Sequence, residues 1–293
     1  MVNFAWTFDI GFGLHIFQVI WVIGLCMVLL SAFIYLPKKV LLGIGLIILF
    51  GHNALDGIVA QGNDVLSIVW YFIHQQSIVS FQEGNSIMFI AYPFLPWLGI
   101  ILLGYSFGEI YQKGYDTALR KKWLLGLGLG SLLLFIVVRY LNVYGDLVPW
   151  SVQDEGNFTF MSFLNVTKYP PSLVYTLMTL GPAFLFLYAF ETSRNWLTNA
   201  LVIIGRVPFF FYILHLYLIH IFGMIGLLIL GEDWKELIDT PAHFSSGYLA
   251  DKDFDLWVTY LVWILVILIL YPFCKMFMQY KANNKEKWWL SYL

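Results

Sequence analysis

The sequence contains little charge. Only 12% of its 293 residues are charged, whereas 60% are apolar. A soluble globular domain carries about 25% charged residues, so this composition excludes that class of protein. The net charge of −2 identifies no partner, and we expect no interaction with nucleic acid.

Cysteine is scarce, and the sequence shows neither a leader peptide nor an internal repeat. Cys26 and Cys274 both lie within apolar runs, which excludes the disulfide framework of a small secreted domain. We expect both to be buried apolar side chains. The start, Met1-Val2-Asn3-Phe4, lacks the basic region of a signal peptide. The lack of a repeat argues against transporters built from inverted repeats.

The sequence contains long apolar runs. Several reach the length that crosses a bilayer, and they lack the apolar/polar alternation of membrane β-barrels. We therefore predict an all-α, polytopic membrane bundle that forms a single domain over residues 1–293 and lies in the lipid bilayer. Its seven predicted spanning helices are residues 14–36, 40–60, 88–110, 123–141, 171–191, 207–230 and 256–278.

Two segments and a group of glycines modify this pattern. Gly205-Arg206-Val207-Pro208 interrupts the apolar run of residues 201–230, so a short helix is expected before the sixth span. Residues 65–74 are too few to span a bilayer and are predicted to form a short interfacial helix. Glycines of the third and fourth spans are expected to allow close helix packing; they are Gly104, Gly108, Gly126, Gly128 and Gly130.

Lysine and arginine are distributed unequally between the two sets of loops. Three lie in one set: Lys168, Lys235 and Lys252. Ten lie in the other: Lys38, Lys39, Lys113, Arg120, Lys121, Lys122, Arg194, Lys281, Lys285 and Lys287. Because cytoplasmic loops are enriched in these residues, we predict that the N-terminus lies outside and the C-terminus in the cytoplasm.

A polar stretch, Gly51-His52-Asn53-Ala54-Leu55-Asp56-Gly57, continues the second predicted span without a loop. His52 and Asp56 are four residues apart and share a helical face, with Asn53 beside them. Polar groups at membrane depth are costly and by default functional, although they can also simply bond neighbouring helices. His52, Asn53 and Asp56 are therefore the candidate catalytic residues.

The predicted orientation gathers more polar and aromatic groups at the outer helix ends. Arg139 could compensate helix-terminal carbonyls, or it could orient a substrate with Asp146 or Asp56 as its partner. The aromatic residues could form an interfacial belt or a platform for a sugar ring. The outer loop after the second span also holds His74. The candidate substrate-binding residues are Arg139, Asn142, Asp146, Asn165, Lys168, Tyr169, His215 and His220.

His215 and His220 are five residues apart, roughly 140° around a helix, so they cannot bind one ion as an i, i+4 pair could. We therefore expect no metal site. Either histidine could act as a base or proton relay, or bond a neighbouring helix.

Glu109 and Glu191 end the third and fifth spans on the inner side, where a carboxylate opposes the helix macrodipole. Arg206 is the expected counter-charge in a structural ion pair. Alternatively, Arg206, helped by Lys121 and Lys122, receives a phosphate-bearing donor molecule from the cytoplasm. Arg206, Glu109 and Glu191 are therefore the candidate cofactor-binding residues.

Six motifs occur in one order along the chain: Phe50–Gly57, Tyr92–Trp97, Arg139–Asp146, Phe163–Ser172, Gly205–Pro208 and His215–His220. Together they resemble bacterial membrane proteins of the DUF1624 family, which is related to the catalytic domain of heparan-α-glucosaminide N-acetyltransferase. The resemblance covers nearly the whole chain from Asn3 to the seventh span.

This resemblance implies a multi-pass acyltransferase of the bacterial inner membrane. It would take an acetyl or other acyl group from cytoplasmic acetyl-CoA or acyl-CoA and transfer it to a sugar or glycan outside. Members of the family carry further helices before the position of Asn3, including the histidine usually assigned the catalytic role. Either the chain is a truncated product, which is the preferred interpretation, or it works without that region. In a truncated product His52 would support or position the substrate, and the isolated chain could be inactive. The sequence does not decide whether the protein forms a homo-oligomer.

The resulting hypothesis is an acyl transfer in which His52, or the family's N-terminal histidine, takes a proton from the acceptor. Asp56 would orient His52, and Asn53 or Arg139 would stabilise the developing oxyanion. The rival hypothesis is a proton-coupled carrier of a sugar or small anion, with a relay through His215, Glu109 and Arg206. A third is a helical scaffold without catalysis.

Overall fold

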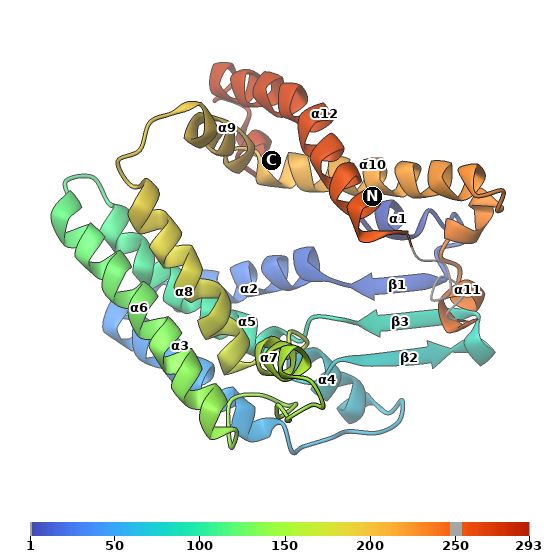
Figure 1. Ribbon diagram of the computed structural model, residues 1–293, viewed down its shortest axis with the longest axis horizontal. Helices are drawn as coiled ribbons and strands as arrows, with labels where there is room; N and C mark the ends of the chain where they lie inside the picture. The colour runs from blue at the N-terminus through green and yellow to red at the C-terminus, as the bar shows by residue number, and fades with distance from the viewer. Residues whose placement is uncertain (1, 247–253, 293) are drawn as a thin grey trace. The chain divides into compact units, whose positions relative to one another are not determined.

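The computed structural model describes residues 2–246 and 254–292 (Figure 1). By its internal contacts the chain divides into two compact units. Unit 1 comprises Met1–His15, Ser80–Ile87 and Ser193–Leu293, and unit 2 comprises Ile16–Val79 and Met88–Thr192.

Unit 2 holds the larger share of the helices. They are α2 (Val19–Phe33), α3 (Lys38–Gly51), η1 (His52–Leu55), α4 (Val65–Ile73), α5 (Phe94–Phe107), η3 (Gly108–Tyr111), α6 (Thr117–Leu141), α7 (Gly156–Leu164) and α8 (Leu173–Phe190). The helices of unit 1 are α1 (Val2–Thr7), η2 (Gln82–Gly84), α9 (Trp196–Gly205), α10 (Pro208–Ile229), η4 (Trp234–Leu237), α11 (Pro241–Ser246), α12 (Leu256–Asn283) and η6 (Trp288–Tyr292).

Within the described residues, six helical segments are long and apolar enough to cross a membrane: Lys38–Leu55, Phe94–Tyr111, Thr117–Leu141, Leu173–Phe190, Pro208–Ile229 and Leu256–Asn283. Most of their apolar side chains are not covered by the protein; only 6% of the Pro208–Ile229 window is buried. Large exposed apolar surfaces of this kind indicate contact with lipid. The predicted polytopic α-helical membrane bundle is confirmed.

The first predicted span is wrong in its first part. Residues Leu14–Phe17 form strand β1, and α2 begins only at Val19. The 15 residues of α2 span about 22 Å at 1.5 Å per residue, which is shorter than the roughly 30 Å hydrocarbon layer. The third predicted span also starts too early, because Ser86–Ile90 form strand β3 and α5 begins at Phe94 after Pro93.

Three short strands form a sheet in the order β1-β3-β2, where β2 is Ser77–Phe81 (Figure 1). The strands are rich in β-branched and aromatic residues, which favour extended backbone. Glu83 and Gly84, between β2 and β3, have positive φ angles of 56° and 94°. The division between the two units falls within all three strands.

Other sequence predictions at the level of elements are confirmed. Residues 65–73 form the short helix α4, whose N-terminus is capped by the Asp64 carboxylate. The break at residues 205–208 separates α9 from α10. Lys252, on which the predicted orientation partly depends, lies outside the described residues, and the orientation stays a prediction.

Close helix packing in unit 2 depends on glycine, but mostly on other glycines than those predicted. A Cβ atom on Gly128 of α6 would lie 2.6 Å from Leu185 Cδ2 of α8, and one on Gly181 of α8 would lie 2.9 Å from Leu132 Cγ. Gly45 of α3 and Gly99 of α5 likewise allow these two helices to approach each other closely. Of the predicted set only Gly128 has this role; a Cβ on each of the others would have open space around it.

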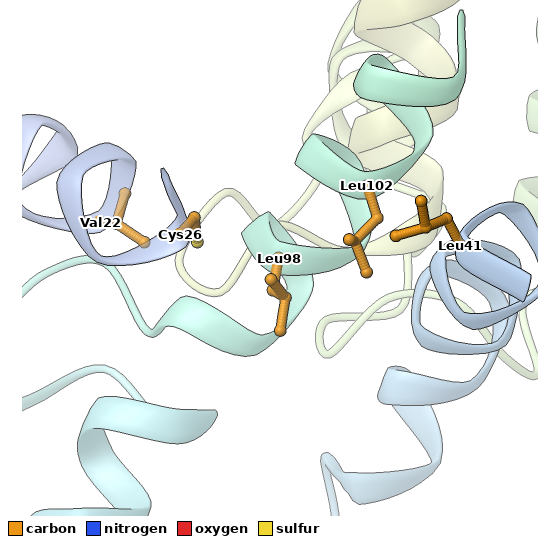
Figure 2. Packing of buried hydrophobic residues seen from close by; sticks show 5 residues of the cluster. All are labelled: Val22, Cys26, Leu41, Leu98 and Leu102. Carbon is orange, nitrogen blue, oxygen red and sulfur yellow. The ribbon is translucent and has the colours of Figure 1, made fainter. Parts of the chain in front are cut away.

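Buried apolar side chains join α2, α3 and α5 at one core cluster. Val22 and Cys26 come from α2, Leu41 from α3, and Leu98 and Leu102 from α5 (Figure 2). Cys26 is 1% exposed and Cys274 of α12 is 0% exposed, and both thiols are free. The prediction that both cysteines serve as buried apolar side chains is confirmed.

Candidate functional site

A buried cluster in unit 2 contains His52, Asp56 and His74. The Nε2 atom of His74 lies 2.9 Å from Asp56 Oδ1, and the rings of His52 and His74 are 5.5 Å apart between centroids in an edge-to-face arrangement. The side chains of His52 and His74 are only 2% and 3% exposed, and that of Asp56 is 14% exposed. His52 and Asp56 were predicted from the sequence to be catalytic, whereas His74 was noted without a predicted role.

Local structure brings these three residues together. His52 begins the 3-10 turn η1, and Asp56 directly follows it. His74 is the residue that ends α4. The loop between them is held against α4 by side chains of that helix and the residue after His74: Trp70 Nε1 donates to Ile58 O, Tyr71 OH donates to Gly62 O, and the Gln75 amide forms two hydrogen bonds with the Ala60 backbone.

Asn53 connects the cluster to α8. Its Nδ2 donates to Asp56 Oδ2 at 2.8 Å, and its Oδ1 accepts a hydrogen bond from the Leu173 backbone N–H at 3.0 Å. One N–H donor and the acceptor oxygen of the amide are therefore used within the protein. Asn53 fixes one carboxylate oxygen of Asp56 and leaves the other oxygen directed at His74.

Three ring nitrogens of the cluster have no hydrogen-bond partner among the described residues. They are Nδ1 and Nε2 of His52 and Nδ1 of His74. Buried polar atoms are nearly always paired, so an unpaired one indicates a ligand, an ion, a water molecule or a catalytic role. The cluster is consequently the strongest candidate site in unit 2.

This geometry corrects one predicted role. The partner of the Asp56 carboxylate is His74, whereas His52 was expected. One of the two N–H donors of Asn53, which with Arg139 was a candidate to stabilise an oxyanion, is held by Asp56, and that role of Asn53 stays a prediction. The sequence contains a signal for His74, because this residue ends a short helix that follows the polar stretch. The sequence does not show that His74 lies close to Asp56.

Arg139 is a structural residue of the loops between α6 and α8. Its guanidinium group is 2% exposed and donates to the backbone carbonyls of Val148, Phe163, Ser162 and Asn165 at 2.7 to 3.1 Å. Its Nη1 also lies 3.6 Å from Asp146 Oδ2, so the predicted pairing with Asp146 is confirmed. With its donors used in this way, the guanidinium is not placed to orient a substrate, and that prediction is wrong.

Asp146, Asn142 and Asn165 belong to the same structural network. The Asp146 carboxylate accepts from Val148 N, Thr167 N, Thr167 Oγ1 and Ser172 Oγ. Asn142 ends α6 with φ 56° and exchanges two side-chain hydrogen bonds with the Trp150 backbone. A pocket beside Arg139, Asn142 and Asp146 measures about 40 Å³. That volume accommodates a few water molecules, so it does not support the predicted sugar-binding role of these three residues.

Tyr144 lies beside the cluster. Its hydroxyl donates to the Phe50 carbonyl, the last turn of α3 before His52. Burial raises the pKa of this hydroxyl, and the nearby Asp56 carboxylate raises it further. Tyr144 thus stays protonated and keeps the end of α3 in place.

A second group in unit 2 combines aromatic rings with one cation. Tyr92 and Tyr169 pack edge to face at 5.0 Å, with their hydroxyls 3.3 Å apart. Lys168 Nζ lies 5.0 Å from the centre of the Tyr169 ring, and the hydrogen bond to Tyr169 raises the pKa of Lys168. Trp97 packs on Tyr92 at 5.6 Å, and its buried Nε1 has no partner among the described residues. Lys168 and Tyr169 therefore combine a cation with an aromatic ring, and their predicted substrate-binding role stays a prediction.

The two acidic residues at the predicted inner side are paired, but not with Arg206. Glu109 lies 3.0 Å from Lys38 Nζ, and Glu191 lies 2.6 Å from Arg120 Nε. Structural ion pairs were the simpler of the two predictions for these glutamates, and Lys38 and Arg120 are the cations. Lys121 Nζ lies 5.0 Å from the centre of the Tyr188 ring.

His215, His220 and Arg206 belong to unit 1. His215 Nδ1 bonds the Tyr212 carbonyl one turn earlier. His220 Nε2 lies 2.8 Å from the Leu237 carbonyl, and the ring stacks on Phe8 at 4.0 Å. Arg206 ends α9. Each histidine thus has a structural contact in its own unit, and the argument against a metal, made for these two alone, does not extend to His52, Asp56 and His74.

Comparison with known proteins agrees with the resemblance carried by the motifs. Residues 5–145 match the family model of heparan-alpha-glucosaminide N-acetyltransferase, catalytic. The match includes His52, Asn53, Asp56, His74 and Arg139 and ends at Gly145, whereas the motif resemblance continued to the seventh span. No curated protein and no solved structure matches the chain. This chain is therefore related to the catalytic domain of heparan-alpha-glucosaminide N-acetyltransferase.

Proposed function

We propose that this protein is a membrane acyltransferase that moves an acetyl or other acyl group from acyl-CoA to a hydroxyl or amine of a sugar or glycan. The observation that carries the proposal is the unpaired, buried Nδ1 of His74 on a ring whose other nitrogen is held 2.9 Å from Asp56 Oδ1. Both residues lie in the stretch that matches the acetyltransferase family model.

The pairing of His74 with Asp56 defines the proton chemistry. A carboxylate that accepts the Nε2–H bond stabilises the tautomer with a free lone pair on Nδ1, and it also stabilises the cation formed when Nδ1 takes a proton. His74 is therefore the general base of the proposal, and Asp56 positions it. The general-base role, predicted from the sequence for His52 or for the family's N-terminal histidine, is thereby assigned to His74.

The reaction itself is a simple acyl transfer. The acceptor oxygen or nitrogen attacks the thioester carbonyl while His74 Nδ1 removes the acceptor proton. The C–S bond then breaks, and the thiolate of CoA leaves and takes up that proton. The products are the acylated acceptor and free CoA thiol, so no oxidant or reductant is needed.

The aromatic group at Tyr92, Trp97 and Tyr169 is the proposed acceptor-binding surface. Sugar rings pack their C–H faces on aromatic rings, and the Lys168 ammonium and the free Trp97 N–H offer hydrogen bonds to hydroxyls. On the predicted orientation this surface faces away from the cytoplasm, whereas acyl-CoA is supplied from the cytoplasmic side of what we propose is the bacterial inner membrane.

An isotope-transfer assay tests the proposal. The purified full chain in proteoliposomes is given radiolabelled acetyl-CoA and a panel of amino sugars and neutral sugars. We expect label in a sugar product together with an equal amount of free CoA thiol. Release of CoA thiol without any acylated sugar, or no consumption of acetyl-CoA at all, would contradict the proposal.

A further inference from the structure

The cluster of His52, Asp56 and His74 has a second property that the acyl transfer does not use. Each residue offers one ligand atom of a kind that binds metal ions, and these three atoms lie within 4.8 Å of one another. Two imidazoles and one carboxylate form a donor set that suits divalent transition metals such as Zn²⁺.

The unpaired nitrogens of His52 point to a ligand. His52 is 2% exposed, yet neither of its ring nitrogens has a partner among the described residues. The acyl transfer as proposed uses His74 and Asp56 and leaves the buried His52 ring unexplained. An ion bound to one nitrogen would remove the free-energy cost of burying that lone pair without a partner.

The surroundings of the carboxylate match those of built metal sites. Asn53 Nδ2 holds Asp56 Oδ2 at 2.8 Å and is itself fixed by the Leu173 backbone N–H. Outer contacts of this kind orient a ligating carboxylate and are typical of metal centres. They leave Asp56 Oδ1 directed at the histidines, 2.9 Å from His74 Nε2.

The spacing needs only a small adjustment to hold an ion. In a tetrahedral zinc site with ligand bonds of about 2.0 Å, neighbouring ligand atoms are separated by about 3.3 Å. The pair of Asp56 and His74 is 2.9 Å apart and would widen slightly when an ion replaces the shared proton. His52, whose ring makes no hydrogen bond, can approach the pair without breaking one.

We propose that His52, Asp56 and His74 form a binding site for one divalent transition-metal ion of the zinc type. Three protein ligands leave a fourth position open for water or for a substrate atom. An ion that replaces the proton shared by His74 Nε2 and Asp56 Oδ1 leaves the neutral His74 ring protonated on Nδ1. It thereby removes both the free Nδ1 lone pair and the Asp56 pairing that the general-base reaction requires. Metal binding and that reaction are therefore alternative states of one cluster, and the metal site does not depend on the proposed acyltransferase function.

Direct metal binding tests the proposal. The full chain, purified in detergent and treated with a chelator, is titrated with Zn²⁺ by calorimetry, and bound zinc is measured by mass spectrometry after gel filtration. We expect one equivalent per chain. We also expect His52→Ala to weaken binding at least about 100-fold, because loss of an outer-shell partner alone costs about 10–100-fold.

His52→Ala is the informative variant because its side chain makes no hydrogen bond in the structure. Its apparent melting temperature without metal should fall only by the effect of the cavity that the buried ring leaves, while the rise that Zn²⁺ causes in wild type is lost. His215→Ala and His220→Ala in unit 1 are the matched controls and should bind zinc like wild type. The absence of stoichiometric zinc binding in wild type, or unchanged binding in His52→Ala, would overturn the proposal.

Discussion

At the scale of single residues, buried polar groups that have hydrogen-bond partners differ in their role from buried polar groups that have none. Asn53, Arg139 and Asp146 are buried, and their side chains form hydrogen bonds with backbone or side-chain partners. His52 and His74 are equally buried and keep unpaired nitrogens. Hydrogen-bonded polar groups stabilise the fold, whereas unpaired ring nitrogens are available to a substrate or an ion.

Asn53→Ala tests the structural side of this distinction. The change leaves the Leu173 backbone N–H and one oxygen of Asp56 without partners in a buried site, so we expect a loss of about 1–3 kcal/mol in unfolding free energy. Thermal unfolding in detergent, followed by circular dichroism, measures it. Asn157→Ala, at an exposed position of α7, is the control and should leave the melting temperature unchanged. Equal melting temperatures for the two variants would refute the assigned role of Asn53.

The stability of the protein is expected to depend on pH through Asp239 of unit 1. Burial raises the pKa of its carboxyl group from 3.8 to about 6, against the opposing influence of His243. The folded state then holds its proton more tightly than the unfolded state, so the contribution of this group to stability is fully present below about pH 4 and is lost as the pH rises to about 6.

Melting temperatures of wild type and Asp239→Asn between pH 4 and pH 7 check this expectation. The variant lacks the titrating group and should gain stability relative to wild type as the pH rises. Glu155→Gln changes an exposed carboxyl group and should not alter the wild-type profile. A constant difference between wild type and Asp239→Asn over this range would show that Asp239 does not titrate there.

The sequence predicts the stretch that contains the candidate site, but not the pairs that its residues form. The polar residues that continue α3 identified His52, Asn53 and Asp56, because charged and amide groups at membrane depth stand out from an apolar background. The contact of Asp56 with His74 joins residues 18 apart across a loop, and no periodicity encodes it. The same holds for Arg139, whose backbone acceptors lie 9 to 26 residues further along.

At the scale of elements, the pairing of α6 with α8 depends on two facing glycines. A Cβ atom on Gly128 would lie 2.6 Å from Leu185 Cδ2 and 3.2 Å from the Gly181 carbonyl oxygen. The backbones can approach closely only because both positions lack a side chain, as is typical of packed membrane helices.

Gly128→Ala should force α6 and α8 apart and lower the unfolding free energy by about 1–3 kcal/mol. Gly126→Ala, two residues away on α6, adds a methyl group where nothing lies within 4 Å. It should be neutral or stabilise by up to about 1 kcal/mol, because alanine favours the helix over glycine. Detergent-induced or thermal unfolding of the two variants compares them directly. A larger loss in Gly126→Ala than in Gly128→Ala would contradict the packing.

Long apolar helices were predictable from the sequence, and the short strands were not. Spans such as α8, α10 and α12 agree with their predicted ranges at the N-terminal end to within two residues, because length and apolarity identify them without reference to the rest of the chain. β1 has four residues, and only Gln18 separates it from the apolar helix α2. Its extended conformation depends on pairing with β3, about 70 residues further along, which no local signal reveals.

At the scale of the whole molecule, the number of crossings determines the side of each loop. The described residues contain six helical segments of spanning length, and α2 is a further apolar helix of 15 residues. The excess of Lys and Arg predicts that the loop between α5 and α6 and the segment after α12 lie in the cytoplasm. On this prediction the loops that follow η1 and α10 lie on the opposite side.

Alkaline phosphatase fusions test this arrangement, since the enzyme is active only outside the cytoplasm. Fusions after Gln61 and after Gly231 should be active. Fusions after Lys113 and after Lys285 should be inactive, and fluorescent protein fused at these two sites should be bright. Activity after Lys113 combined with inactivity after Gln61 would reverse the predicted orientation and place the His52 cluster on the cytoplasmic side.

The central claim is that the cluster of His52, Asp56 and His74 is the reacting site of a membrane acyltransferase. The most direct test is the rate of acetyl transfer from acetyl-CoA to a sugar acceptor by wild type, His74→Ala and Asp56→Asn, with His215→Ala as the control histidine. We predict that the first two variants lose at least about 100-fold in kcat, as expected for removal of a general base or of the group that positions it, while the control stays within a few-fold of wild type. Transfer at the wild-type rate by His74→Ala would contradict the claim.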